Sequence, residues 1–396
     1  MGAERAEVLV LGAGIAGCAL AYHLADRGVG PVVLYDPRTP GAGATGRAAG
    51  IVTEQHWNRW DVEVTRESQA QYAEMSSRWD PSAYTVNGFV RWAHGAEALK
   101  VLDAARSRLR GWGVRADELD EAGLAARVPW GRFDDGSRGL WCPSDAVVTP
   151  SAIGEIYAEG ARRAGVELYL GTPMASFLRR EGAWELETGG HVVRAASAVV
   201  AAGAWSKAIL ASVGHPLPLA PYRTQAAVLR PSSGPEVFPS VHDIDVDIYA
   251  RPEAKGRILA GDGTRLVEVD PESFQTGADE QFVEHLAGTF GRRFPGWSDA
   301  ELVRAWAGVC TSTPDRRPLV GPVPGAERLY SIVGFNGFGV MRAGGVAARL
   351  ADLLASGGNR AEERLAEVRP ARFRSDHPAF APRPGFTLDD GDDPRF

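Results

Sequence analysis

The sequence predicts an α/β protein (α+β in its two-domain organisation) in which a parallel sheet and a mostly antiparallel sheet are interleaved. Apolar runs at 8–11 and 198–202 each end at glycine, as strands buried on both faces of a parallel sheet do. Residues 244–249 alternate apolar and polar, which is typical of an antiparallel strand with one exposed face. A chain of 396 residues exceeds what one hydrophobic core usually serves, so we expect two domains.

Composition excludes several classes of protein. The chain has 43 basic and 50 acidic residues and a net charge of −7, so it repels polyanions and we expect no nucleic-acid partner. Its three cysteines, Cys18, Cys142 and Cys310, form no even disulfide set and favour a reducing, cytoplasmic location. The apolar run at 8–25 contains three glycines and His23 and follows acidic residues, so we expect neither a signal peptide nor a membrane span.

The first 36 residues predict one strand–helix–strand unit. A strand at 8–11 is followed by apolar positions at helical spacing over 15–25 and by a second strand at 32–35, which ends at Asp36. A unit of this length with parallel strands is the core of a Rossmann-like domain, in which a ligand binds at the turn between strand and helix.

The turn itself fits a dinucleotide-binding motif. Gly12 permits a tight turn, Gly14 lets the backbone approach a phosphate, and Gly17 lets the helix pack close to its strand. With 47 glycines, such a match arises by chance roughly 0.65 times in this chain, and 41–46 is a second match that follows prolines rather than a strand. The flanking strand and helix, with Asp36 to bind a ribose, favour the first match. The motif alone does not separate FAD from NAD.

Three distant blocks accompany the turn in a fixed order. After 43–51 come 201–206, then 306–308 with 313–315, and finally 334–339. With these blocks the chain resembles the D-amino-acid-oxidase-like flavoprotein family, in its glycine oxidase and sarcosine oxidase branch, over about residues 6 to 370.

The resemblance implies FAD, held by a Rossmann-like domain with its flavin ring at the boundary with the antiparallel domain. Segment 44–51 would wrap the ribityl chain, Met174 would contact adenine through main-chain atoms, and 337–341 would face the pyrimidine edge of the flavin. The residues expected at the cofactor are Gly12, Ala13, Gly14, Ile15, Ala16, Gly17, Asp36, Ala44, Thr45, Gly46, Arg47, Ala49, Gly50, Ile51, Met174, Ala202, Gly203, Trp205, Cys310, Gly337, Phe338, Gly339, Val340 and Met341.

The expected domains are discontinuous. The FAD-binding domain would comprise 1–85, 146–212 and 308–371, and the substrate domain 86–145 and 213–307. Residues 372–396, rich in Pro, Asp and Arg, would form an irregular C-terminal tail.

The resemblance also implies an activity. Members of this family oxidise a C–N bond of an amine or amino acid and release an imine that water hydrolyses, after which oxygen takes the electrons and hydrogen peroxide is released. Two alternatives stay open. One is a dehydrogenase of a hydroxy acid or an amine with a non-oxygen acceptor, and the other is a non-catalytic flavin-binding or assembly protein, including a domain acting on modified tRNA, which the net charge disfavours.

The residues expected at the substrate depart from the family pattern. Cys310 stands where glycine-oxidase-like members have a carboxylate-binding arginine, and Met341 where sarcosine-oxidase-like members have a lysine. A second family lysine, linked to oxygen activation, corresponds to Leu259. The candidate replacements for the carboxylate ligand are Arg251, Arg342 and Arg223, and the expected pocket residues are Trp57, Tyr249, Arg251, Phe338, Met341 and Arg342. We expect no metal.

Attachment of the flavin is a separate question. Sarcosine-oxidase-like proteins attach it by a thioether to a cysteine near Cys310, but the residues after Cys310 differ from their motif, so we expect non-covalent binding with the thioether as the alternative. Arg47 stands where dimethylglycine-dehydrogenase-like members have a flavin-linked histidine, which excludes that linkage.

Overall fold

The structure is a computed structural model that describes residues 4–262 and 268–373. The predicted tail at 372–396 lies outside the described residues, apart from its first two. Among the described helices, none combines the length and the apolar character needed to cross a membrane. The expectation of a cytoplasmic location stays a prediction.

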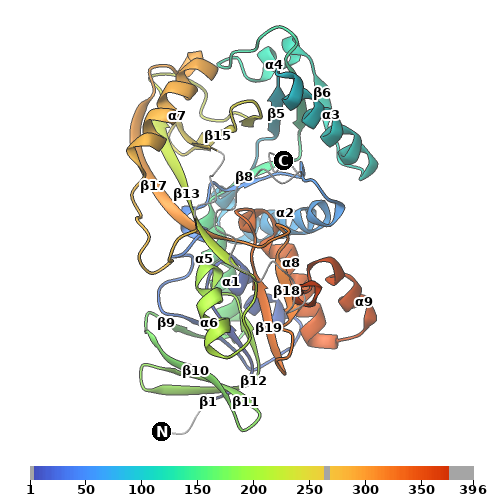
Figure 1. The fold of residues 1–396 in the computed structure, drawn as a ribbon, viewed down its shortest axis with the longest axis vertical. Coiled ribbons are helices and arrows are strands. Elements are labelled where there is room, and N and C mark those ends of the chain that lie inside the picture. Colours follow the sequence, from blue (N-terminus) through green and yellow to red (C-terminus); the bar gives the residue numbers. More distant parts are fainter. Residues whose placement is uncertain (1–3, 263–267, 374–396) are drawn as a thin grey trace.

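The first sheet has eight strands and forms the lower half of the molecule in Figure 1. Strands β12, β1, β2 and β9 are neighbours in that order and all pair in parallel, while β19 pairs in parallel with β12. The bounds of the eight strands are β1 Glu4–Leu11, β2 Val32–Asp36, β9 Glu167–Leu170, β10 Met174–Arg180, β11 Ala183–Thr188, β12 His191–Val200, β18 Leu319–Pro322 and β19 Leu329–Val333.

Burial on both faces explains the continuous apolar run in β1. Val8 and Val10 belong to a core that includes side chains of α1, α5 and α8, whereas Leu9 and Leu11 belong to a second core on the other face, with Trp184 of β11. The helices are α1 Ile15–Asp26, α2 Arg59–Trp79, α5 Pro150–Arg163, α6 Ser206–Ser212, α8 Gly339–Ser356 and α9 Asn359–Glu363. The parallel βαβ unit is therefore confirmed.

The second sheet lies above the first in Figure 1 and has the order β17-β13-β16-β15-β14-β5-β7-β6. Of its neighbouring pairs only β14 and β5 run parallel, so the prediction of a mostly antiparallel second sheet is confirmed. The strands are β5 Phe89–Ala93, β6 Asp117–Leu119, β7 Arg138–Cys142, β13 Ala220–Arg230, β14 Ser240–Asp243, β15 Ile248–Glu253, β16 Arg257–Asp262 and β17 Glu301–Ser312.

The two faces of this sheet differ. One face packs on α7 Glu280–Arg293 through a core that contains Trp92, Ile248 and Phe290, and the helices α3 Ala96–Gly111 and α4 Glu121–Arg127 lie at the β6 end. A small third sheet, β3 Ile51–Val52, β8 Ala146–Val148 and β4 Tyr84–Val86, completes the strands among the described residues. The other face of the second sheet is turned toward the first sheet.

The predicted strand at 244–249 is wrong in its first four residues. Ile244 to Asp247 form the turn between β14 and β15, in which Asp247 has a φ of +51°. Asp245 is held in this turn because its carboxylate accepts the backbone N–H groups of His94 and Gly95, at 2.8 and 2.9 Å. The strand was predicted because apolar and polar residues also alternate in this tight turn.

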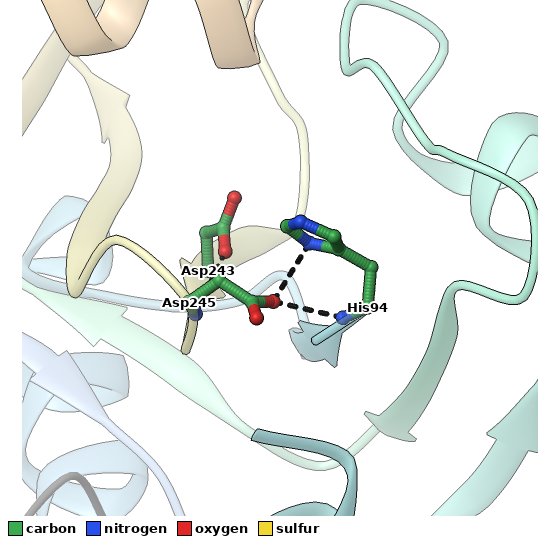
Figure 2. A group of neighbouring side chains, drawn as sticks. All are labelled: His94, Asp243 and Asp245. Atoms are coloured by element: carbon green, nitrogen blue, oxygen red, sulfur yellow. Dashed lines mark hydrogen bonds and ion pairs between the residues drawn. The ribbon is translucent and has the colours of Figure 1, made fainter. Parts of the chain in front are cut away.

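An ion-pair cluster joins this turn to neighbouring elements. Figure 2 shows His94 and Asp245 facing each other, with Nδ1 of His94 at 2.8 Å from a carboxylate oxygen, and Asp243 beside them. These three residues offer metal-ligand types, but Arg293 of α7 pairs with Asp243 and its Nη2 lies 3.3 Å from Nδ1 of His94. Asp243 is therefore paired with a cation of the protein itself, while Asp245 is hydrogen-bonded to His94.

Candidate active site

The first glycine turn has the close packing that the sequence predicts. Gly12 has a φ of +112°, and a Cβ added at Gly17 would lie 1.8 Å from the carbonyl oxygen of Gly12. A Cβ at Gly14 would meet only Oγ1 of Thr45, at 3.5 Å. Gly12 and Gly17 are thus required by the turn, whereas the missing side chain of Gly14 leaves its backbone open to a ligand.

The start of α1 fits a pyrophosphate. Gly14 caps α1 without a side-chain hydrogen bond to the free N–H groups, and no acidic residue stands in its first turn. Thr45 accepts the N–H of Ile15 at 3.0 Å, and Asp36 accepts the N–H of Ala13 at 2.8 Å. Because the N–H groups of a helix start carry partial positive charge, these residues suit an anionic group.

The other residues expected along the dinucleotide surround this turn. A Cβ at Gly12 would lie 2.8 Å from Cα of Ala202, so segment 202–203 adjoins the turn. Trp205 stacks under Arg38 with its ring centroid at 4.3 Å from the guanidinium carbon. Met174 begins β10, just beyond Gly171, whose N–H donates to the carbonyl of Asp36. Segment 41–46, the second glycine match, is a turn whose Gly41 N–H donates to the carbonyl of Ala13.

A cavity of about 750 Å³ lies between the two sheets. It brings together predicted residues from distant parts of the chain, namely Ala44, Arg47, Ala49, Gly50, Ile51, Trp57, Tyr249, Cys310, Gly337, Phe338, Val340 and Met341. Gly339 begins α8 directly behind Phe338, and the N-terminus of α8 has no side-chain cap. The remaining predicted residues at the glycine turn, at Met174 and at 202–205 lie outside the cavity wall.

Aromatic rings form the apolar part of the wall. The ring centroids of Trp57 and Phe338 are 5.0 Å apart in an edge-to-face arrangement, and His56 is edge-on to both rings. Tyr249 lies across Gly261, where a Cβ would come within 2.3 Å of its hydroxyl oxygen. Burial lowers the pKa of His56 to about 3, so its imidazole is neutral at neutral pH.

The predicted carboxylate-binding arginines are not at the cavity. Arg342 is fully buried and pairs with Asp61, Arg251 pairs with Glu253 and donates to the carbonyl of Ala49, and Arg223 pairs with Asp279. None of the three lines the cavity, and each guanidinium forms an ion pair with a carboxylate, so a role in substrate binding stays a prediction for them.

The cavity is also lined by arginines that the sequence analysis did not predict. Arg91 of β5 and Arg108 of α3 lie at its wall, together with Gln55 and His242. Only alternation along the strand could have indicated Arg91. Its neighbours Val90 and Trp92 are fully buried in the core of the second sheet, so the side chain of Arg91 points to the opposite face.

A buried carboxyl group holds the segment that carries Trp57 to the cavity. Asp145 is 1% exposed, and its two oxygens accept the hydroxyl of Thr53 at 2.5 Å and the N–H of Glu54 at 2.9 Å. Burial raises the pKa of Asp145 to about 8 from 3.8. The group therefore binds a proton in the folded protein at pH values where the unfolded chain has released it.

This shift gives the stability a pH dependence. Between about pH 4 and pH 8 the folded state holds one more proton than the unfolded state, so the free energy of unfolding falls as pH rises, by up to about 1.4 kcal/mol per unit. We expect Asp145→Asn, whose oxygen can still accept the Glu54 N–H and whose NH2 group can donate to the Thr53 hydroxyl, to lose less stability than the wild type between about pH 5 and pH 7.5 in urea titrations. Equal slopes in the two proteins would contradict this assignment.

Comparison with known proteins agrees with the site geometry. A model of the FAD dependent oxidoreductase family (DAO) matches residues 7–353. Rat mitochondrial dimethylglycine dehydrogenase is 28% identical over 376 residues, which cover 89% of this chain and 43% of that protein, so the chain spans less than half of this relative. Glycine oxidase of Bacillus licheniformis is 23% identical, over 89% of this chain and 93% of that enzyme.

The fold has solved counterparts. The crystal structure of L-proline dehydrogenase from P. horikoshii superposes with a TM-score of 0.86 at 24% identity and covers 94% of this chain and 98% of its own. The family model spans most of the chain, and it includes the glycine turn and the cavity segments. This chain belongs to the FAD dependent oxidoreductase family.

Proposed function

We propose that this protein oxidises the C–N bond of an amine or amino acid with FAD as its cofactor. The imine product would then be hydrolysed by water, and oxygen would accept the electrons with release of hydrogen peroxide. The observation that carries the proposal is the cavity itself, because segments 44–51 and 336–341 meet there on a slot walled by Trp57, Tyr249 and Phe338. These three aromatic rings suit the uncharged carbon and nitrogen atoms of a small amine.

The residues present fit the cofactor. The N–H groups at the start of α1 that follow Ile15, whose own N–H donates to Thr45, would hold the pyrophosphate, and Asp36 would face the adenosine ribose. The uncapped start of α8 lies at the cavity behind Gly337 and Phe338, where its partial positive charge would stabilise negative charge on the pyrimidine edge of the ring. Bound FAD supplies the acceptor for two electrons and the hydrogen removed from the carbon next to nitrogen.

The side chains of the cavity would position the substrate and exclude water. Trp57 and Phe338 pack edge-to-face and Tyr249 is fixed across Gly261, so the slot is pre-formed. Neutral His56 would place no charge beside a bound amine and has no acidic imidazolium proton to donate to it.

We further propose that the flavin is held without a covalent bond. Burial raises the pKa of Cys310 to about 11, so it is a neutral thiol at neutral pH and a poor nucleophile toward the flavin methyl group. We expect precipitation with trichloroacetic acid to release all yellow colour into the supernatant, for the wild type and for Cys310→Ala alike. Colour that stays with the wild-type pellet but not with the variant pellet would establish the thioether instead.

Anaerobic mixing tests the activity. We expect the oxidised flavin band of the purified yellow protein to bleach with amines, N-methyl amino acids or D-amino acids, and peroxide to form when air is admitted. Bleaching by a hydroxy acid alone would overturn the amine proposal, and bleaching without peroxide would establish a dehydrogenase with a different acceptor. The dehydrogenase has one observation in its favour, since Leu259 replaces the lysine that the family resemblance links to oxygen activation and is 2% exposed.

No bleaching by any compound would instead support a flavin-binding protein without catalytic activity, and would overturn the proposed function.

A further inference from the structure

The cavity follows one row of side chains across the second sheet. In the strand registers Arg91 pairs with His242, His242 with Tyr249, and Tyr249 with Gly261, while Ala226 pairs with Trp306 at the far edge. All of these except Gly261 line the cavity. From β17 to β5 the sheet has five inter-strand steps, so at about 4.8 Å each the row extends roughly 24 Å.

The flavin-binding segments meet this row at its β17 end and at its middle, where Arg251 of β15 donates to the carbonyl of Ala49. Trp306 donates through Nε1 to the carbonyl of Arg47 at 3.1 Å, and Gly308 packs against the same arginine. The opposite end is built from Arg91, His242 and Gln55. Because one extended residue spans only about 3.5 Å, a substrate as small as glycine would leave the opposite end unfilled.

The opposite end is polar and carries charges of both signs. The Arg91 side chain is fixed, since Nη1 donates to the carbonyl of Gln55 at 3.2 Å and its guanidinium lies over the ring of Phe89 at 5.4 Å. The pKa of Arg91, lowered to about 10 by burial, still leaves it a cation at neutral pH. Asp247 also lines this end, but it pairs with His242 at 2.8 Å.

A second cation stands at the rim. Helix α3 presents Val101, Ala104 and Arg108, three positions that share one helix face, to the cavity. Arg108 is exposed, so it can meet an anion before the anion reaches Arg91. A planar guanidinium that is held in place suits a carboxylate.

We infer that the end of the cavity at Arg91 binds a second acidic group of the substrate, a carboxylate remote from the carbon that is oxidised. The substrate class is then an amino acid or N-alkyl amino acid with an acidic side chain. This inference rests on the proposed C–N oxidation and adds the feature by which the site selects its substrate.

Matched substrates test the inference. We would measure flavin reduction by the holoenzyme, under anaerobic conditions, with both enantiomers of glutamate, glutamine, 2-aminoadipate and norleucine and with their N-methyl derivatives. Glutamate and glutamine have the same shape and differ in charge, so their ratio of kcat/KM isolates recognition of the carboxylate. We expect the acid to be preferred by about tenfold or more, as for a charge-assisted hydrogen bond.

Variants of the arginines test which residues recognise the remote carboxylate of the substrate. We expect Arg91→Gln to lower the acid-to-amide ratio by about tenfold or more, mainly through KM for the acid, and Arg108→Ala to lower it by about threefold. Arg110→Ala, on the same helix but outside the cavity wall, should leave the ratio unchanged. Because Arg108 is exposed, its variant folds even where a change at buried Arg91 would not.

The outcomes are distinguishable. If no compound reduces the flavin, the proposed function fails. If neutral amino acids reduce it as fast as acidic ones, or if neither arginine variant changes the acid-to-amide ratio, the oxidation stands and the carboxylate site is overturned.

Discussion

Replacing Gly17 by alanine is expected to weaken cofactor binding strongly by deforming the first turn. The new Cβ would lie 1.8 Å from the carbonyl oxygen of Gly12, and Gly12 cannot retreat because Ala201 and Ala202 lie against it. Overpacking of this kind costs about 2–3 kcal/mol, which, if it falls on the bound state, corresponds to a roughly 30- to 150-fold weaker affinity for FAD. FAD content after purification and fluorescence titration of the apoprotein measure the effect.

Gly14→Ala separates an effect on FAD binding from an effect on the stability of the fold. Its Cβ would have ordinary contact with Thr45 at 3.5 Å, so we expect the apoprotein to lose no more than about 1 kcal/mol of stability while FAD binding weakens. Gly291→Ala on α7, where a Cβ meets nothing within 4 Å, is the control for FAD binding, which it should leave unchanged while helix propensity raises the stability by up to about 1 kcal/mol. An apoprotein of Gly17→Ala with wild-type stability would contradict the packing explanation.

Breaking the buried ion pair of Arg342 and Asp61 is expected to have the largest effect on stability. The two side chains are 0% and 1% exposed, and Arg342 also donates to the carbonyl of Phe335 at 2.7 Å, so it fixes the turn that leads into α8. Removing one partner leaves an uncompensated buried charge, and we expect Asp61→Asn to lower the free energy of unfolding by about 3–5 kcal/mol in denaturant titrations.

An exposed pair provides the comparison. Lys100 and Glu97 on α3 are 72% and 79% exposed, so Lys100→Ala should change the stability by less than about 0.5 kcal/mol. A loss of similar size in Asp61→Asn and Lys100→Ala would show that burial of the Arg342 pair contributes nothing. The same measurement tests whether Arg342 acts as a structural residue, as its pair with Asp61 indicates.

Local patterns were sufficient to predict the first sheet and the glycine turn. The run at 8–11 is apolar at every position because Val8 and Val10 face one core while Leu9 and Leu11 face another. The close approach of Gly17 to Gly12 depends only on residues within one turn. Contacts between near neighbours in the sequence are what periodicity and motif spacing report.

Contacts between segments that are distant in the sequence could not be predicted from such patterns. Asp245 looks like an alternating strand residue until its partners at 94 and 95, some 150 residues earlier, are known. Distant contacts also distinguish two arginines on strands of the same sheet. Arg251 donates to the carbonyl of Ala49, whereas Arg91 lines the cavity. The family resemblance supplied the flavin-side residues, and it could not supply Arg91 because no motif includes it.

The row across the second sheet also has a consequence for how this enzyme could be changed. Each of its strands contributes one cavity-facing position at this register, while the next residue along, such as Val90 or Ala250, is buried in the core on the opposite face. Single substitutions along the row should therefore alter the length and polarity of the chamber without disturbing the core beneath it. A new substrate preference could be reached one position at a time, with the flavin-binding half of the protein left as it is.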